Sequence, residues 1–271
     1  MKTHAVIIVF LLLYIPQMGI SQKFDKPESI TFDKKTGDYF VTNVGSGDIL
    51  KIDKEGNTKA FISGYVSFLG IKLHRGILYC AENKKTGNDF VRGFDKETGK
   101  LVFSLSIPNT KQLNDIEFDN KENLYVTDRI GNKVYKVSIK KRAYEVIDST
   151  INTPNGLYFD KKNNRMLICN TIDSCSIYSF DLKTDKISTI VNTNFPHFDG
   201  ITMDKKGNIY LTSWSIDWKS SILYKYDGKN FTELLKNKNG MADIEFNEKT
   251  NCIDIANYFG NSVTHFKLAD E

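Results

Sequence analysis

Hydrophobic and polar residues alternate along most of this chain in short runs. A run such as residues 28–33 is followed by a polar turn, then by an apolar run such as residues 39–42, and then by two further alternating runs. These runs are rich in β-branched and aromatic residues and are bounded by Asn, Gly, Asp and Lys, which is typical of β-strands. No convincing amphipathic helical pattern interrupts them. The sequence therefore predicts an all-β chain.

The strand pattern repeats six times, and each repeat opens with the same tripeptide slot. The slots begin at residues 28, 69, 114, 155, 199 and 242, so successive slots are 41 to 45 residues apart. Four short strands in a unit of this length are typical of a β-propeller blade. We therefore predict a six-bladed β-propeller built from four-stranded antiparallel blades.

The last repeat reaches Glu271 with only three predicted strands. The segment Gln22–Lys26, just before the first slot, is free to supply the fourth strand. We expect this N-terminal strand to close the ring, because an open sheet edge would otherwise remain.

The first 21 residues differ from the repeats. Lys2 is followed by an apolar run at residues 5–15 and by small residues at 19–21, which is the pattern of a secretory signal peptide. The apolar run is short for a membrane-spanning helix, although an uncleaved anchor is an alternative. We expect residues 1–21 to be removed, and a single propeller domain over residues 22–271 to be exported to the periplasm or the medium without a membrane span.

Charge is evenly mixed, with 37 Lys and Arg residues against 33 Asp and Glu residues and a net charge of +4. Nucleic-acid binding is not expected, because it usually requires a concentrated basic stripe. We expect a monomer that binds a small molecule.

The four cysteines do not form a CxxC pair, so a zinc site has no support. Export permits disulfides. Cys169 and Cys175 flank a predicted hairpin loop and could form a disulfide or remain as buried thiols. Cys80 and Cys252 lie in separate repeats, and we expect both to stay unpaired.

The first position of the six slots carries the candidate chemistry. The first strand of a propeller blade is innermost, so these side chains should form a ring at the mouth of the central channel. If this first position served only to form a turn, every repeat should carry Gly, Asn or Asp there. Glu28, Leu69 and Ala242 do not fit that expectation. Oxygen ligands of this kind suit a hard divalent cation, with calcium the best match and magnesium, manganese or zinc as alternatives. The four oxygen-bearing residues are Glu28, Asn114, Asn155 and Asp199.

These slots resemble motifs of the regucalcin and gluconolactonase family of six-bladed propellers, which includes diisopropyl fluorophosphatase. Glu28-Ser29 is similar to the family's first metal-ligand motif, and Pro154-Asn155-Gly156-Leu157 to its PNGL motif. Asp199-Gly200-Ile201 resembles its PDG motif, with Phe198 in place of the proline. Asn114 matches a further asparagine near the metal. The resemblance implies that Asp199 both binds the metal and serves the chemistry.

The leading hypothesis is a metal-dependent hydrolase, a lactonase or related esterase, in which Asp199 is the general base or the nucleophile. The alternative is an exported, non-enzymatic propeller that binds a protein or glycan around a structural cation. Trp214 could contact substrate or pack between blades. The candidates for substrate contact are Arg129, Trp214, Trp218, Tyr258, Asp243 and His197.

Overall fold

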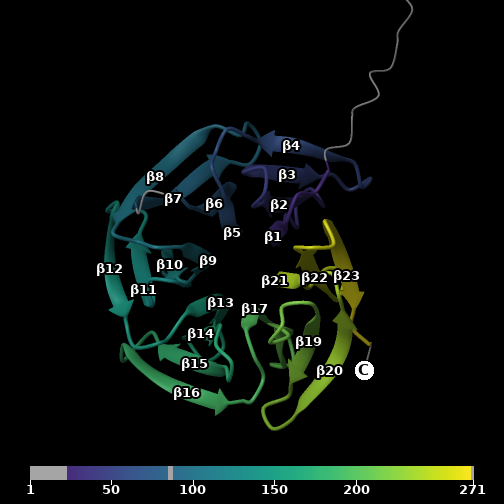
Figure 1. The fold of residues 1–271 in the computed structure, drawn as a ribbon. Coiled ribbons are helices and arrows are strands. Elements are labelled where there is room, and N and C mark those ends of the chain that lie inside the picture. The colour runs from purple at the N-terminus through teal and green to yellow at the C-terminus, as the bar shows by residue number, and fades with distance from the viewer. Residues whose placement is uncertain (1–22, 85–87, 270–271) are drawn as a thin grey trace, which may run out of the picture.

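The computed structural model describes residues 23–84 and 88–269, and the regular structure in these segments consists of β-strands alone. The strands form six antiparallel sheets arranged around a central channel (Figure 1). The predicted six-bladed β-propeller is confirmed. The predicted signal peptide lies outside the described residues, within which no helix is long and apolar enough to span a membrane.

Each sheet runs outward from the channel in chain order. The innermost strands are β1 (Pro27–Phe32), β5 (Phe68–His74), β9 (Leu113–Phe118), β13 (Pro154–Asp160), β17 (Phe198–Met203) and β21 (Met241–Asn247). The second strands are β2 (Tyr39–Asn43), β6 (Ile77–Glu82), β10 (Asn123–Asp128), β14 (Arg165–Asn170), β18 (Ile209–Trp214) and β22 (Cys252–Asn257). The third strands are β3 (Asp48–Ile52), β7 (Asn88–Asp95), β11 (Lys133–Ser138), β15 (Ser176–Asp181), β19 (Ser221–Tyr226) and β23 (Ser262–Lys267). The outer strands are β4 (Thr58–Ile62), β8 (Leu101–Pro108), β12 (Ala143–Asp148), β16 (Lys186–Asn192) and β20 (Phe231–Asn237).

Apolar side chains fill the spaces between neighbouring blades. Phe40 and Ile49 of the first blade, for example, pack with Phe68, Ile71 and Phe94 of the second. The alternation of each strand supplies one such face toward each neighbour. This packing makes the ring one continuous structure.

The slots open the innermost strands, and each strand is irregular there. The pairing register of β1 with β2 shifts between Pro27 and Ile30, and the other five innermost strands shift at the equivalent place. A bulge of this kind re-aims side chains and leaves a backbone amide without its ladder partner. It is the local reason why the first slot residue points into the channel mouth.

Threonines on the second strands satisfy these freed amides and join the blades. The hydroxyl of Thr127 accepts a hydrogen bond from the Asp115 amide at 3.0 Å and donates one to the carbonyl of Asn155 in the next blade at 2.9 Å. Thr42 and Thr212 make the same pair of bonds in the first and fifth blades. The slot backbones are thereby tied from blade to blade.

All four cysteines are buried free thiols. Of the two alternatives for Cys169 and Cys175, the structure shows buried thiols and not a disulfide. Cys80 and Cys252 are unpaired as predicted. Cys169 occupies the threonine position of the fourth blade, where its thiol donates to the carbonyl of Asp199 at 3.2 Å. Its role is to hold the next slot rather than to cross-link a hairpin.

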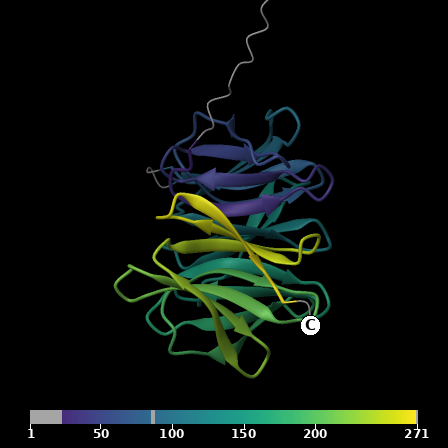
Figure 2. The ribbon, with the colours of Figure 1, turned by 90° about the vertical axis from the view of Figure 1, so that its right-hand side faces the viewer.

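The sixth sheet has three strands within the described residues, with β23 outermost (Figure 2). The prediction that the N-terminal segment adds a fourth strand is wrong for residues 23–26, which form no strand. Their carbonyls instead accept hydrogen bonds from residues 44 and 45, at the end of β2. The ring closes through side chains: Ser29 donates to Asp243 at 2.5 Å, and Glu245 accepts from the Phe32 amide at 2.9 Å.

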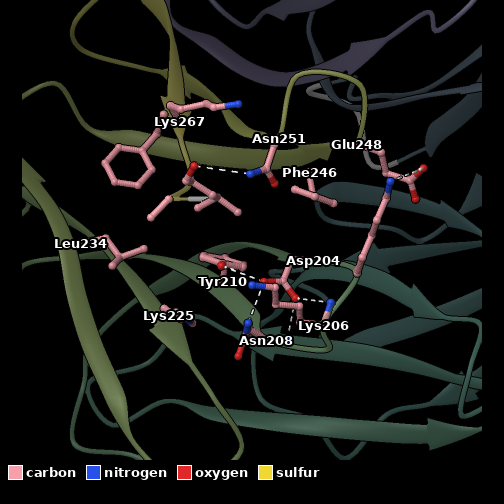
Figure 3. A pocket seen from close by; sticks show the side chains of 14 residues that line it. Asp204, Lys206, Asn208, Tyr210, Lys225, Leu234, Phe246, Glu248, Asn251 and Lys267 are labelled. Carbon is pink, nitrogen blue, oxygen red and sulfur yellow. Dashed lines mark hydrogen bonds and ion pairs between the residues drawn. The ribbon is translucent and has the colours of Figure 1, made fainter. Parts of the chain in front are cut away.

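A groove of about 540 Å³ lies between the fifth and sixth blades, on the face away from the slots (Figure 3). Leu234 of β20 and Phe266 of β23 provide part of its apolar wall, and Lys225 and Lys267 lie at its rim. The groove borders the outer edge of the three-stranded blade.

Candidate functional site

A cavity of about 290 Å³ opens at the slot end of the central channel. Its lining includes every residue predicted to hold a metal, together with four of the six predicted substrate contacts. These eight residues are Glu28, Asn114, Arg129, Asn155, Asp199, Trp214, Trp218 and Tyr258. Each metal-ligand candidate is the second residue of its innermost strand, so six-fold repetition brings together positions far apart in the sequence (Figure 1).

Three of the slot side chains form a connected chain of hydrogen bonds. The Asn114 amide donates to Oδ1 of Asn155, and Nδ2 of Asn155 donates to Oδ1 of Asp199 at 2.8 Å. Gly156 follows Asn155, and a Cβ there would lie 2.5 Å from the backbone oxygen of Asp199. Glycine at this position therefore permits the close approach of β13 and β17 on which the contact depends.

Trp214, the last residue of β18, holds the other side of the same carboxylate. Its indole Nε1 donates a hydrogen bond to Oδ2 of Asp199 at 2.9 Å. With Asn155 on Oδ1, both oxygens of Asp199 have a fixed donor. The Trp214 ring also packs against Tyr258 and Phe259 of the sixth blade, which is one of the two roles predicted for it.

The cationic group in this cavity comes from the loop after β10. Nε of Arg129 donates to the side-chain oxygen of Gln112 at 2.8 Å, which fixes the guanidinium at the cavity wall. The positive charge of Arg129 works to lower the pKa of both Glu28 and Asp199. It partly balances the two carboxylates.

Burial nevertheless dominates the acid–base character of the site. Burial raises the pKa of Glu28 well above its usual range, and the negative charge of Asp199 raises it further. Burial also raises the pKa of Asp199, against the hydrogen bonds from Trp214 and Asn155. Tyr258 follows the same pattern, since burial and the nearby Glu28 raise its pKa. Two carboxylates thus lie close together in one cavity, where burial disfavours the charged form of each.

The donor chemistry fits a hard divalent cation. Glu28 and Asp199 supply carboxylate oxygens, and Asn114 and Asn155 supply amide oxygens. A divalent cation would provide a counter-charge for the carboxylates of Glu28 and Asp199. No group of three His, Cys, Asp or Glu side chains converges in the described segments. The candidate site therefore depends on its asparagines and lacks the nitrogen and sulfur ligands of a structural zinc site.

Two predicted residues lie outside the cavity. Asp243 faces the channel below it, where burial raises its pKa to about 7 despite the hydrogen bond from Ser29. His197 lies behind Trp218, with its ring stacked on the indole at a centroid distance of 4.1 Å. Its Nε2 is 3.3 Å from Oδ1 of Asp173. Both residues therefore lie beside residues that line the cavity without lining it themselves.

Several residues that the structure places here were not predicted from the sequence. Gln112 orients Arg129, and Phe259 extends the cavity wall beside Tyr258. Asp115 faces the channel below, where burial and Asp243 raise its pKa. Asp115 is the second residue of its slot, whereas the prediction considered only the first residue of each slot. The signal for Gln112 is its position two residues before a slot, and no motif marks Phe259.

Comparison with solved structures places the same fold in proteins of different function. A gluconolactonase from Xanthomonas campestris matches with a TM-score of 0.73 and 13% identity, covering 89% of this chain and 85% of that one. A luciferin-regenerating enzyme matches with a TM-score of 0.64 and 14% identity, covering 87% and 85%. Virginiamycin B lyase from Staphylococcus aureus matches with a TM-score of 0.63 and 12% identity, covering 91% and 85%. At such identities the likeness establishes the fold alone.

A search of curated protein sequences found no match. The family model described as the SMP-30/gluconolactonase/LRE-like region matches residues 26–235. This match spans five blades and all four metal-ligand candidates, Glu28, Asn114, Asn155 and Asp199. The chain therefore belongs to the SMP-30/gluconolactonase/LRE-like family.

Proposed function

We propose that this protein is a metal-dependent hydrolase that opens a lactone or cleaves a related ester, with calcium as its cation. The observation that carries the proposal is the pairing of two carboxylates, the buried Glu28 and the partly buried Asp199, in one small-molecule-sized cavity with Arg129. Family membership and the fold shared with a gluconolactonase support this reaction class.

Glu28, Asn114, Asn155 and Asp199 would hold the cation. When bound, it would polarise the substrate carbonyl and stabilise the negative charge that develops on the carbonyl oxygen. Glu28 and Asp199 would share its positive charge. The amides of Asn114 and Asn155 would add ligands without further negative charge.

Asp199 is the candidate general base. A carboxylate that remains ionised in a desolvated site accepts a proton more readily than one in water. Asn155 and Trp214 each donate to one of its oxygens, so its orientation is fixed before substrate arrives. Asp199 would take a proton from an attacking water, or attack the carbonyl directly as a nucleophile. Arg129 would contact the substrate from the opposite wall.

The non-enzymatic alternative is less well supported. A protein or glycan docked on the rim would leave Glu28, which is 8% exposed, out of reach at the bottom of the cavity. A small molecule of suitable size would reach it.

A chelation experiment tests the proposal. The purified protein is treated with a chelator and assayed against a panel of lactones and aryl esters, with and without added calcium. The proposal predicts turnover of at least one compound that disappears after chelation and returns with calcium. Absence of turnover across the panel, together with unchanged thermal stability after chelation, would contradict it.

A further inference from the structure

Exposed apolar side chains gather on the loops around the cavity mouth. Of nine large hydrophobic side chains that are exposed in the described segments, five lie on loops at the slot end of the blades. These five are Val66, Ile130, Ile216, Trp218 and Phe259. Of these five, Trp218 and Phe259 line the cavity, so the exposed apolar surface that a bound molecule can reach comes from them.

Two of these five residues continue into the cavity as an aromatic wall. Trp214 lies 5.7 Å from Trp218 and 5.3 Å from Phe259 between ring centroids, and Tyr258 lies 6.2 Å from Trp214. All four rings line the cavity. They come from the fifth and sixth blades only, so the wall is confined to one side.

The opposite side of the cavity is mostly polar. It is formed by Ser67, Asn83, Gln112 and Arg129 from the second and third blades and the loops that precede them, together with the apolar Leu69. A bound molecule therefore meets apolar rings on one flank and hydrogen-bonding groups on the other, with the slot carboxylates beneath. Such a cavity favours a ligand with one apolar end.

Trp218 is held in place although 43% of its surface is exposed. Its ring stacks on His197, and its amide donates to the carbonyl of Ser215 at 2.9 Å, in a turn that the Asp217 side chain also supports. The backbone of Trp218 is left-handed, with φ of 58°.

Trp218 and Arg129 line both the mouth cavity and a neighbouring one. That second cavity, of about 570 Å³, is lined by Trp218 and Arg129 together with Thr171, Asp173 and His197. Truncating the indole would remove one of the four rings of the aromatic wall and so change both the shape and the chemistry of that flank.

We infer that the site selects lactones or esters that carry an aromatic or bulky apolar group, and that Trp218 is the main determinant of this selectivity. This inference rests on the proposed hydrolase function. The apolar ring of such a substrate would lie against Trp218, Trp214 and Phe259. A polyhydroxylated sugar lactone would instead place hydroxyl groups against these rings, where they lose hydrogen bonds to water without replacement.

The test compares γ-phenyl-γ-butyrolactone with unsubstituted γ-butyrolactone and with gluconolactone, using the calcium-loaded protein. We expect kcat/KM for the phenyl lactone to exceed that for each of the other two about tenfold or more. In Trp218→Ala this preference should fall about tenfold, while Trp218→Phe should retain most of it. Ile216→Ala is the matched control, because Ile216 lies on the same loop, is 60% exposed and does not line the cavity.

Binding provides a readout that does not need turnover. Trp214 and Trp218 are the two tryptophans of the chain, and both line the cavity, so titration with 4-phenylbutyrate should change the intrinsic fluorescence. Trp218→Ala should weaken this binding about tenfold and Ile216→Ala should leave it unchanged.

The outcomes separate the two proposals. A preference for gluconolactone, or an equal phenyl preference in wild type and Trp218→Ala, overturns the selectivity and leaves the hydrolase in place. Tight 4-phenylbutyrate binding that depends on Trp218, without turnover of any lactone or ester, supports the aromatic site and contradicts the hydrolase.

Discussion

The indole of Trp214 donates a hydrogen bond of 2.9 Å to Oδ2 of Asp199, and this contact joins the aromatic wall of the cavity to its candidate base. The same ring faces Phe259 edge-on at 5.3 Å. Trp214 thus orients a charged group with its nitrogen and bounds the cavity with its ring. The two roles can be separated by substitution.

We predict that Trp214→Phe lowers kcat for lactone hydrolysis by about tenfold or more, because a hydrogen bond to a charged group contributes about 1.5–3 kcal/mol. Phenylalanine keeps an aromatic ring in the wall, so KM for an apolar lactone should change by less than about threefold. Steady-state kinetics checks both values. An unchanged kcat would show that Trp214 does not position Asp199.

We predict that Glu28→Gln has opposite effects on stability with and without calcium. Without calcium, the variant should melt at a higher temperature than wild type, because burial and Asp199 disfavour the Glu28 charge. With calcium at about a hundred times its dissociation constant, wild type should gain about 2.7 kcal/mol, and the variant much less. Thermal unfolding at fixed protein concentration measures both. A calcium response equal to that of wild type would remove Glu28 from the ligand set.

The pair formed by Asp33 and Lys96 predicts a pH-dependent contribution to stability across the first two blades. Lys96 Nζ lies 2.5 Å from Oδ2 of Asp33. Burial works to raise the pKa of Asp33, and the hydrogen bonds from Lys96, the Lys35 amide and Thr36 outweigh it and lower the pKa. A carboxylate with a lowered folded-state pKa stabilises the fold above its unfolded pKa of about 3.9, and this stabilisation is lost as the pH falls through the folded value.

Lys96→Met should therefore destabilise the protein by about 2 kcal/mol at pH 7, and the difference from wild type should shrink as the pH approaches about 3. Denaturant unfolding at a series of pH values measures the trend. Lys54→Met is the matched control, because the Lys54 side chain is 69% exposed and its pairing with Glu55 should contribute little. If the loss of stability in Lys96→Met stays constant with pH, the loss comes from packing and not from the ion pair with Asp33.

Cys169 should behave as a hydrogen-bonding residue. Its thiol accepts from the Gly156 amide and donates to the carbonyl of Asp199. Cys169→Thr should be close to neutral, because Thr42, Thr127 and Thr212 make these bonds in other blades. Cys169→Val should cost about 1–3 kcal/mol by leaving two buried polar groups unsatisfied. Equal stability of the Thr and Val variants would contradict this role.

Thiol counting checks the same part of the structure. All four cysteines are free. Alkylation of the denatured, unreduced protein should therefore modify four thiols, as mass spectrometry would show. A mass two alkyl groups short would indicate a disulfide that this structure does not contain.

The period of the sequence was sufficient to predict the fold and the location of the cavity. Alternation predicts strands, and the six slots predict innermost strands whose second residues converge at the channel mouth. Glu28, Asn114, Asn155 and Asp199 meet there because a blade repeat converts a shared column into a ring. Register along the chain was the physical reason that this inference succeeded.

The repeat period does not predict which side chains of different blades contact each other. Whether Asp243 faces the mouth or the channel below depends on the bulge in β21 and on its bond with Ser29, 214 residues away in sequence. His197 was expected to contact substrate because it precedes Asp199 by two residues, and its ring stacks on Trp218 outside the lining of the mouth cavity. The course of residues 23–26 depends on backbone bonds to the end of β2, which strand propensity does not reveal.

The most direct test of the central claim is lactone hydrolysis by the calcium-loaded protein and by Asp199→Asn, with calcium affinity measured on both. We predict that the substitution lowers kcat/KM by at least about a hundredfold, as expected for loss of a general base, while calcium still binds through Glu28, Asn114 and Asn155. Hydrolysis that survives in Asp199→Asn, at a rate near that of wild type, would contradict the account.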